Sequence, residues 1–190
     1  FIMVNMSELK GLTVTLARDV DVLLIPDAYP VNLVAGTDVY ISQALGTSYT
    51  VIADGKMMRL SGDDADALGE DFAEALKSAL PELEGSPKEQ VWQLLKTCYD
   101  PEIPVSIVDL GLIYSVNLLE MGEGADKIRA HVVMTLTAPA CGMGPILLEE
   151  IKQKLVVIDE VVDVVVELVF DPPWSQEMMS DEAKLTLGVF

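Results

Sequence analysis

Residues 127–145 read KIRAHVVMTLTAPACGMGP, and within them a strand pattern gives way to a loop. The apolar side chains of the first part alternate, as they do in a strand with one buried face. They are Ile128, Ala130, Val132, Met134 and Leu136. The loop holds Cys141 among Pro, Gly and Ala residues, and residues 142–155 then repeat apolar side chains at helical spacing. The stretch therefore predicts a strand, a loop and a helix in succession.

The neighbouring segments complete a small domain around this unit. Residues 110–120 alternate as a first strand, and the turn-like MGEGAD joins them to the second strand as a hairpin. Residues 161–170 predict a third strand whose inward side chains include Val162 and Phe170. This strand returns through a helix, so the three-stranded sheet should have mixed strand directions.

Two further helices should frame the sheet. The first follows Ser86, with Pro87 at its first position and Glu89 as the capping-box partner, and it should stop before Pro101. The last covers 180–188 and ends at a glycine. The order α-β-β-α-β-α over residues 86–190 therefore predicts an α+β fold.

The N-terminal third has a different texture. Residues 11–62 hold short strand-like runs separated by turn residues, which predicts a small β-rich module with a barrel or rolled sheet. Asp54-Gly55 between two such runs predicts a tight hairpin. Residues 63–85 are acidic and rich in alanine, and we interpret them as a linker with one or two helical pieces.

Composition narrows the classes of partner. The chain has 12 Lys and Arg residues against 31 Asp and Glu residues, a net charge of −19, which repels nucleic acid and anionic membranes. No apolar run approaches the roughly 20 residues that cross a bilayer, and the start FIMVNMSELK does not have the pattern of a signal peptide. Only two cysteines are present, which suits a reducing compartment. We therefore expect a cytoplasmic protein, with neither a membrane nor nucleic acid as partner.

Cys141 is the first candidate for chemistry. A thiol at a strand-to-helix junction faces unpaired helical N–H groups, which favour the thiolate and lower the pKa. Gly142 leaves room for a ligand or a partner to approach. The same residues also fit a small side chain that packs before a helix. By contrast, Cys98 falls on the apolar face of its helix, which favours core packing.

The other candidates are polar or aromatic residues in stiff loops. Asp100 and Glu102 lie in a proline-rich loop, where two carboxylates could bind a metal or steer a partner, or serve as turn and cap residues. Trp174 follows two prolines and suits a lid on the core or an anchor for a partner. His131 is the single histidine, and it lies roughly 20 Å along the strand from the segment that leads to Cys141, too far for a catalytic dyad.

Three stretches together resemble a known domain. They are YDPEIPVSIVDLGLIY (99–114), MTLTAPACGMG (134–144) and VFDPPWSQEMMSDEAKLTLG (169–188). They are similar to the domain shared by cytosolic iron–sulfur assembly factors and PaaD-like proteins, and the N-terminal module resembles the extra part of SufT-type members. The resemblance implies functional positions at Asp100, Pro101, Glu102, Asp109, Gly111, Thr137, Cys141 and Trp174.

The resemblance implies an auxiliary, non-enzymatic role in assembling or delivering iron–sulfur clusters, with Cys141 as the transient metal ligand. The implied partners are iron–sulfur scaffold or carrier proteins and client apoproteins. A cubane cluster takes four thiolates, so one chain is a poor permanent holder. A shared site with a partner, or a homodimer that pairs two Cys141 thiols, is chemically reasonable. Two alternatives stay open: an adaptor that never touches iron, and a thiol enzyme.

Overall fold

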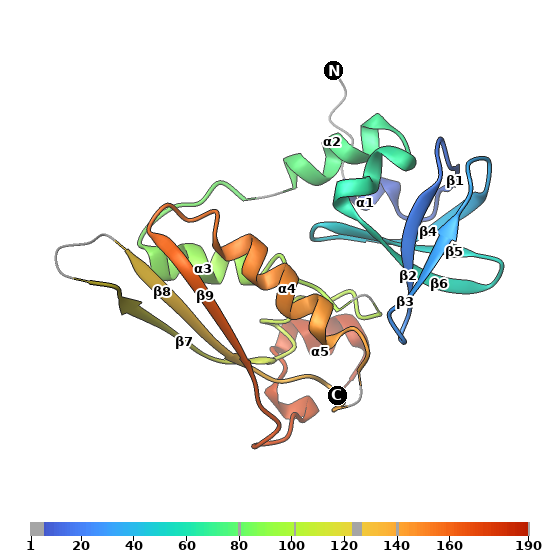
Figure 1. Cartoon of the computed structure of the whole chain (residues 1–190). Helices are drawn as coiled ribbons and strands as arrows, with labels where there is room; N and C mark the ends of the chain where they lie inside the picture. The colour runs from blue at the N-terminus through green and yellow to red at the C-terminus, as the bar shows by residue number, and fades with distance from the viewer. Residues whose placement is uncertain (1–5, 80, 101, 123–126, 140, 190) are drawn as a thin grey trace. The chain divides into compact units, whose positions relative to one another are not determined.

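A computed structural model of the 190-residue chain describes residues 6–79, 81–100, 102–122, 127–139 and 141–189 (Figure 1). The chain divides into two compact units, each with its own core. The first comprises residues 1–81 together with 101–104, and the second comprises residues 82–100 and 105–190.

The first unit is a six-stranded antiparallel sheet with the order β1-β4-β5-β6-β2-β3. Its strands are β1 (Thr13–Thr15), β2 (Val20–Leu24), β3 (Tyr29–Leu33), β4 (Asp38–Leu45), β5 (Ser48–Ala53) and β6 (Lys56–Ser61). The predicted hairpin is confirmed: Asp54 and Gly55 join β5 to β6, with φ angles of 50° and 73°. Positive φ at both positions suits the right-handed twist of the paired strands.

The sequence missed β3 because Pro30 lies inside it. Proline has no N–H to give to a neighbouring strand, so it is tolerated at the edge of a sheet. The structure places β3 at the end of the sheet order, where only β2 pairs with it among the described strands.

The acidic segment after β6 is not a linker over its first part. Residues 62–78 form η1 (Gly62–Ala67) and α2 (Glu70–Ser78), and α2 buries Phe72, Ala75 and Leu76 in the core of the first unit. The buried Tyr49 hydroxyl donates a hydrogen bond of 2.8 Å to the Phe72 carbonyl, which fixes α2 against the sheet. Phe72, Ala75 and Leu76 stand at helical spacing and form one apolar face, a pattern that the acidic composition of the segment obscured. A short helix, α1 (Met6–Leu9), precedes β1.

The second unit has the predicted order of elements. They are α3 (Pro87–Leu95), β7 (Ile113–Glu120), β8 (Ile128–Met134), α4 (Gly144–Leu155), β9 (Val161–Leu168), η2 (Gln176–Met178) and α5 (Asp181–Leu187). β7 pairs antiparallel with β8, and β8 pairs parallel with β9, so the expected mixed sheet is confirmed. The capping box at Ser86 and Glu89 begins α3, also as expected.

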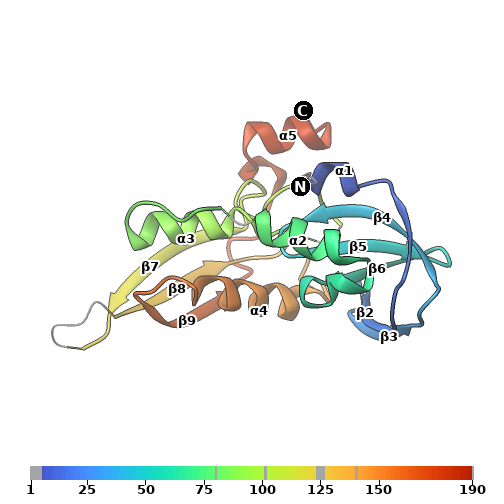
Figure 2. The same cartoon turned by 90° about the horizontal axis from the view of Figure 1, so that it is seen from above.

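The core of the second unit lies between the sheet and two helices. α4 contacts both α3 and β9, and together the two helices cover one face of the sheet (Figure 2). Buried side chains of α3, β8, α4 and β9 form this core: Val91, Leu94, Leu95, Ala130, Val132, Met134, Leu147, Ile151, Leu155, Val161 and Val164.

Two side chains of the third predicted strand were expected to point into the core but are exposed to solvent. Val162 is 50% exposed and Phe170 is 41% exposed. The register between β8 and β9 shifts so that Ile128 faces Val161 and Arg129 faces Asp163, which leaves Val162 as an extra residue in a bulge. Phe170 follows the end of β9, so the alternation of the strand no longer applies to it.

Candidate functional site

Strand direction brings the three motif stretches to one end of the second unit's sheet. Because β7 is antiparallel to β8 and β8 is parallel to β9, the start of β7 lies beside the ends of β8 and β9. The loops at this end are residues 105–112, 135–143 and 169–180, and we call them the loop end. Backbone hydrogen bonds link them at the sheet: Thr135 N–H donates to Leu112 at 2.9 Å, and Val169 N–H donates to Met134 at 2.8 Å.

Asp109 organises the first of these loops. Its carboxylate accepts a hydrogen bond of 2.6 Å from the Ser106 hydroxyl, and its N–H donates to the same oxygen at 3.1 Å. Its carbonyl accepts from the N–H of Ser180 at 2.8 Å, which ties the loop to the C-terminal segment. Burial, and then the negative charge of Asp109, raise the pKa of Tyr99. Asp109 thus has a structural task in addition to any role toward a partner.

The C-terminal segment is held down by side chains that the sequence alone could not pair. The indole N–H of the half-buried Trp174 donates to the Leu110 carbonyl at 2.7 Å, and the Tyr114 hydroxyl donates to the Pro172 carbonyl at 2.7 Å. Gly111 has a φ of +74°, and a Cβ on it would lie 2.2 Å from the carbonyl oxygen of Met178. Trp174 therefore packs over the first loop, and its role toward a partner stays a proposal.

Cys141 lies partly exposed in the second loop. Its N–H donates to the Ala138 carbonyl at 3.3 Å, and its carbonyl accepts from Gly144 N–H at 3.1 Å. The helix starts at Gly144 with Met143 as its N-cap, two residues later than the sequence predicted, so Cys141 precedes the first turn of α4. Gly142 beside it is exposed, and Thr137 is half-buried.

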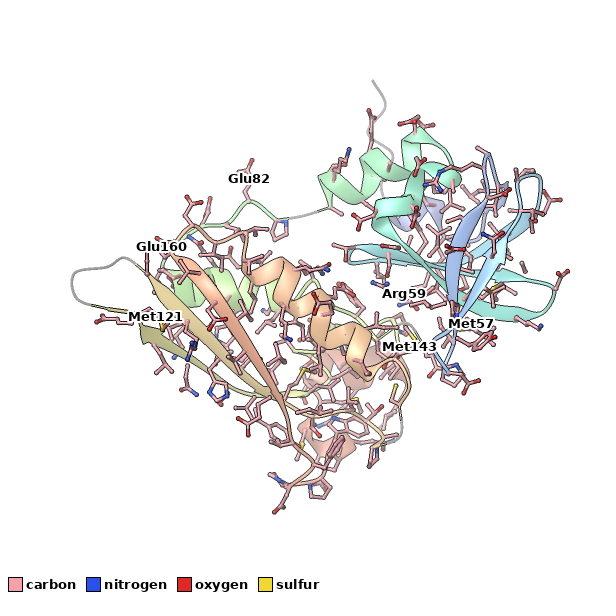
Figure 3. The ribbon with its side chains drawn as sticks, in the orientation of Figure 1. Met57, Arg59, Glu82, Met121, Met143 and Glu160 are labelled. Carbon is pink, nitrogen blue, oxygen red and sulfur yellow. The ribbon has the colours of Figure 1, made fainter. Side chains whose placement is uncertain are left out.

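Loop 135–143 approaches the core closely on either side of Cys141. A Cβ on Gly144 would lie 2.8 Å from the Leu136 side chain, so this glycine permits the close contact. Met143 is 3% exposed, and its buried side chain anchors the loop to the core. Figure 3 shows Met143 at the α4 end that faces away from Glu160, which stands before β9. The thiol of Cys141 is thus presented at the surface by a loop with buried neighbours.

Cys98 has the opposite environment. It is fully buried behind α3, and its thiol donates to the Leu94 carbonyl at 3.6 Å. Burial raises its pKa to about 12, although the charge of Lys154 opposes the shift. Cys98 therefore stays protonated at neutral pH, as expected for a core residue and unlike a metal ligand.

Lys154 is an unexpected buried cation beside Cys98. It is 6% exposed, and its ammonium donates to the Thr97 carbonyl at 2.7 Å and to the Thr97 hydroxyl at 2.9 Å. Glu150, one turn earlier on α4, pairs with it at 3.1 Å. This contact fixes the end of α3 to α4, and the helical spacing of Glu150 and Lys154 was its only signal in the sequence.

The two carboxylates of the DPE motif fall in different units of the chain. Asp100 is 7% exposed, whereas Glu102 is exposed and belongs to the 101–104 segment that groups with the first unit. Pro101 lies outside the described residues. Over the described parts of the chain, no group of three or more His, Cys, Asp or Glu side chains could hold a metal ion.

His131 faces the side of the sheet opposite to α3 and α4. Its Nε2 lies 2.9 Å from Glu167 Oε2, and Arg129 pairs with Asp163 on the same face. This position agrees with a cross-strand residue. Every helix in the described parts of the chain falls short of the length and hydrophobicity that a membrane span requires.

The sequence of the chain is similar to a known protein family and to several of its members. Residues 88–168 match the family described as iron–sulfur cluster assembly protein. A Porphyromonas gingivalis protein named Fe-S protein maturation auxiliary factor is 44% identical over 53% of this chain and 90% of its own length. The chain belongs to this iron–sulfur cluster assembly family.

A second relative indicates the type within the family. The Fe-S protein maturation auxiliary factor SufT of Staphylococcus aureus is 43% identical over 47% of this chain and 96% of its own length. The chain is a SufT-type member, as its motifs predicted. Among solved structures, a domain of unknown function DUF59 from Bacillus anthracis is 33% identical in sequence. The match covers 55% of this chain and 93% of the Bacillus anthracis chain, with a TM-score of 0.46.

Proposed function

We propose that the protein is an auxiliary factor in the maturation of iron–sulfur proteins, and that Cys141 carries clusters or delivers them to client apoproteins. Its membership of the iron–sulfur assembly family and the names of its relatives support the general role. These relatives are named as auxiliary factors, which favours a role other than enzyme. A reducing cytoplasmic compartment suits this role, because free thiols stay reduced there.

One observation supports the use of Cys141 in particular. Of the chain's two cysteines, Cys98 is buried with a pKa of about 12, whereas Cys141 is partly exposed at the loop end. Each chain thus offers one accessible cysteine, and a cubane cluster takes four thiolates. The remaining ligands would come from a scaffold, carrier or client protein, or from a second copy in a homodimer. Such shared ligation is easily reversed, and a carrier must release its cargo.

A single accessible cysteine per chain is also compatible with the alternative function, an adaptor. An adaptor would use the loop end, with Trp174, Asp109 and Cys141, to contact the assembly machinery without binding iron. A thiol enzyme has less support, because the single histidine pairs with Glu167 on the open face of the sheet.

Anaerobic reconstitution tests the proposal. The full chain is incubated with ferrous iron and sulfide, desalted, and analysed for bound iron and sulfide and for visible absorbance. We expect wild type and Cys98→Ala to take up iron, and Cys141→Ala to take up almost none. Cys98→Ala is the matched control, since it removes the other thiol from the core.

Each result has a definite reading. Equal, negligible iron in wild type and Cys141→Ala would overturn cluster handling and leave the adaptor role. Iron uptake that is lost in Cys98→Ala but kept in Cys141→Ala would show that Cys98, and not Cys141, is the ligand. Turnover of an acyl substrate that disappears in Cys141→Ala would indicate the thiol enzyme.

A further inference from the structure

Strand β9 lies at an edge of the second unit's sheet. In the strand order β7-β8-β9, only β8 pairs with it among the described strands. One row of backbone N–H and C=O groups on an edge strand has no neighbouring strand, and this row is a template for another chain. The question is which groups of β9 form that row and what would pair with them.

The hydrogen bonds of β8 decide which groups face outward. Val169 N–H donates to the Met134 carbonyl of β8 at 2.8 Å. Alternate residues of a strand direct their backbone groups to opposite neighbours. Counting back from Val169, the N–H and C=O groups of Val164, Val166 and Leu168 therefore face away from β8.

β9 has a bulge at Val162 near its start, but otherwise it has few of the features that protect edge strands. Proteins commonly shield an edge with Pro, Lys or a very short strand. β9 is eight residues long, reads VVDVVVEL and contains five valines without Pro, Gly or Lys. Val165 in its middle is 40% exposed. β7, the opposite edge, carries Ser115 and Asn117 in place of such a valine run.

Charge indicates the chemistry of the partner. Residues 156–170 contain Asp159, Glu160, Asp163 and Glu167 and no Lys, Arg or His. Asp163 already pairs with Arg129 and Glu167 lies beside His131, so the charge that a partner would meet is chiefly that of Asp159 and Glu160, just before β9. Figure 3 shows Glu160 at the start of β9. A second copy of β9 laid along the first would bring two such acidic segments together, and like charges on paired strands destabilise the pairing. An extended segment with Lys or Arg between apolar residues would instead meet opposite charge.

We propose that β9 binds an extended, basic and apolar segment of a partner protein by strand addition. Such a segment would run beside β9 for about 26 Å, at about 3.3 Å per residue, and one end of it would reach the loop end that presents Cys141. In this way the edge would hold a client while its cysteines approach Cys141. The last step rests on the proposed function, whereas the strand addition does not.

A peptide binding experiment tests the proposal. The probe is a labelled, acetylated nonapeptide of the sequence Lys-Val-Thr-Val-Lys-Val-Thr-Val-Lys, and a version with Glu in place of Lys is its charge control. We expect the basic peptide to bind at least about tenfold more tightly than the acidic one. In amide exchange by NMR, the peptide should slow exchange at Val164, Val166 and Leu168, and leave Val165 unchanged because its N–H already bonds to β8.

Two variants separate the edge from the fold. Val166→Pro removes an outward N–H without touching the ladder to β8, and Val166→Thr changes the same side chain but keeps the N–H. We expect Val166→Pro to weaken basic-peptide binding by about tenfold or more and Val166→Thr to change it by less than about twofold. Circular dichroism checks that both variants are folded; if Val166→Pro is not, the exchange pattern of the wild type decides.

The outcomes do not depend on iron. Equal binding to both variants, or protection without the alternating pattern, would overturn the proposal, as would equal binding of the two peptides. Light scattering that shows a dimer lost in Val166→Pro would assign the edge to a second copy instead, and this too would contradict the proposal. Cys141→Ala should bind the peptide like wild type, so failure of cluster handling and failure of strand addition remain distinguishable.

Discussion

Substitution of Gly111 by alanine probes the contact that closes the loop end. Gly111 has a φ of +74°, and the new Cβ would lie 2.2 Å from the Met178 carbonyl oxygen, 2.7 Å from its carbon and 2.8 Å from its Cβ. Two of these neighbours are backbone atoms, which cannot rotate away. We expect the segment that contains Met178 to leave its place.

The size of the effect follows from two separate costs. A left-handed backbone costs an alanine about 1–2 kcal/mol relative to glycine. Displacement of the segment also weakens the hydrogen bonds from Trp174 to Leu110 and from Tyr114 to Pro172, and each is worth about 1 kcal/mol. Gly111→Ala should therefore destabilise the second unit by about 3–4 kcal/mol.

Gly188→Ala is the matched control. Gly188 ends α5 with a φ of +68°, and a Cβ there would meet no atom within 4 Å. It should cost only the backbone part, about 1–2 kcal/mol. Urea unfolding is followed by fluorescence in a Trp92→Phe background, where Trp174 is the only indole of the chain's two that remains.

In native buffer, the Trp174 emission of Gly111→Ala should already shift to the red, because the indole loses its packed position. Equal destabilisation by the two glycine substitutions, with unchanged Trp174 emission in both, would contradict this prediction. It would mean that the C-terminal segment does not pack on Gly111.

Three further predictions concern buried polar groups. Burial raises the pKa of Cys98 from 9.0 to about 12, so the unfolded chain loses the thiol proton at a lower pH than the folded chain. The free energy of unfolding, measured with urea, should therefore fall as the pH rises from 9.0 toward 12, and the fall should be smaller in Cys98→Ala. Lys154→Met removes the ammonium that pairs with the half-buried Glu150 and donates to Thr97, and it should cost about 2–4 kcal/mol in thermal unfolding. Adding Glu150→Leu should recover part of this cost, and no recovery would contradict the pairing. Tyr49→Phe removes the hydroxyl that donates to the Phe72 carbonyl, while the carbonyl keeps its place in the α2 helix, and should cost the first unit about 1 kcal/mol. An unchanged melting temperature would contradict the contact.

Local patterns predicted the elements well, and long-range pairing lay beyond them. Ser86 with Pro87 and Glu89 begins a helix through contacts among neighbours in sequence, so the pattern was sufficient. The turn at Asp54-Gly55 is equally local. By contrast, the exposure of Val162 depends on the register of β9 against β8, which a period of two cannot reveal.

In the candidate site, too, local features were predicted from the sequence and long-range contacts were not. The sequence identified Cys141, and its placement in a loop between β8 and α4 follows from the alternating and helical patterns on either side. Contacts with a large separation in sequence were missed, such as Trp174 to Leu110 and Ser180 to Asp109. These contacts decide that Asp109 and Trp174 help to build the loop end, and residue types alone do not carry that information.

In the proposed function, the sulfur of Cys141 bonds to the iron of a cluster in transit. Differential alkylation measures this bond: the anaerobically loaded chain and the apo chain are treated briefly with iodoacetamide, and modification of Cys141 and Cys98 is quantified by peptide mass. We expect loading to protect Cys141, chelation of the iron to restore its reactivity, and buried Cys98 to stay unmodified in both samples. Alkylation of Cys141 at the same rate in loaded and apo chains would show that its sulfur does not bond to iron.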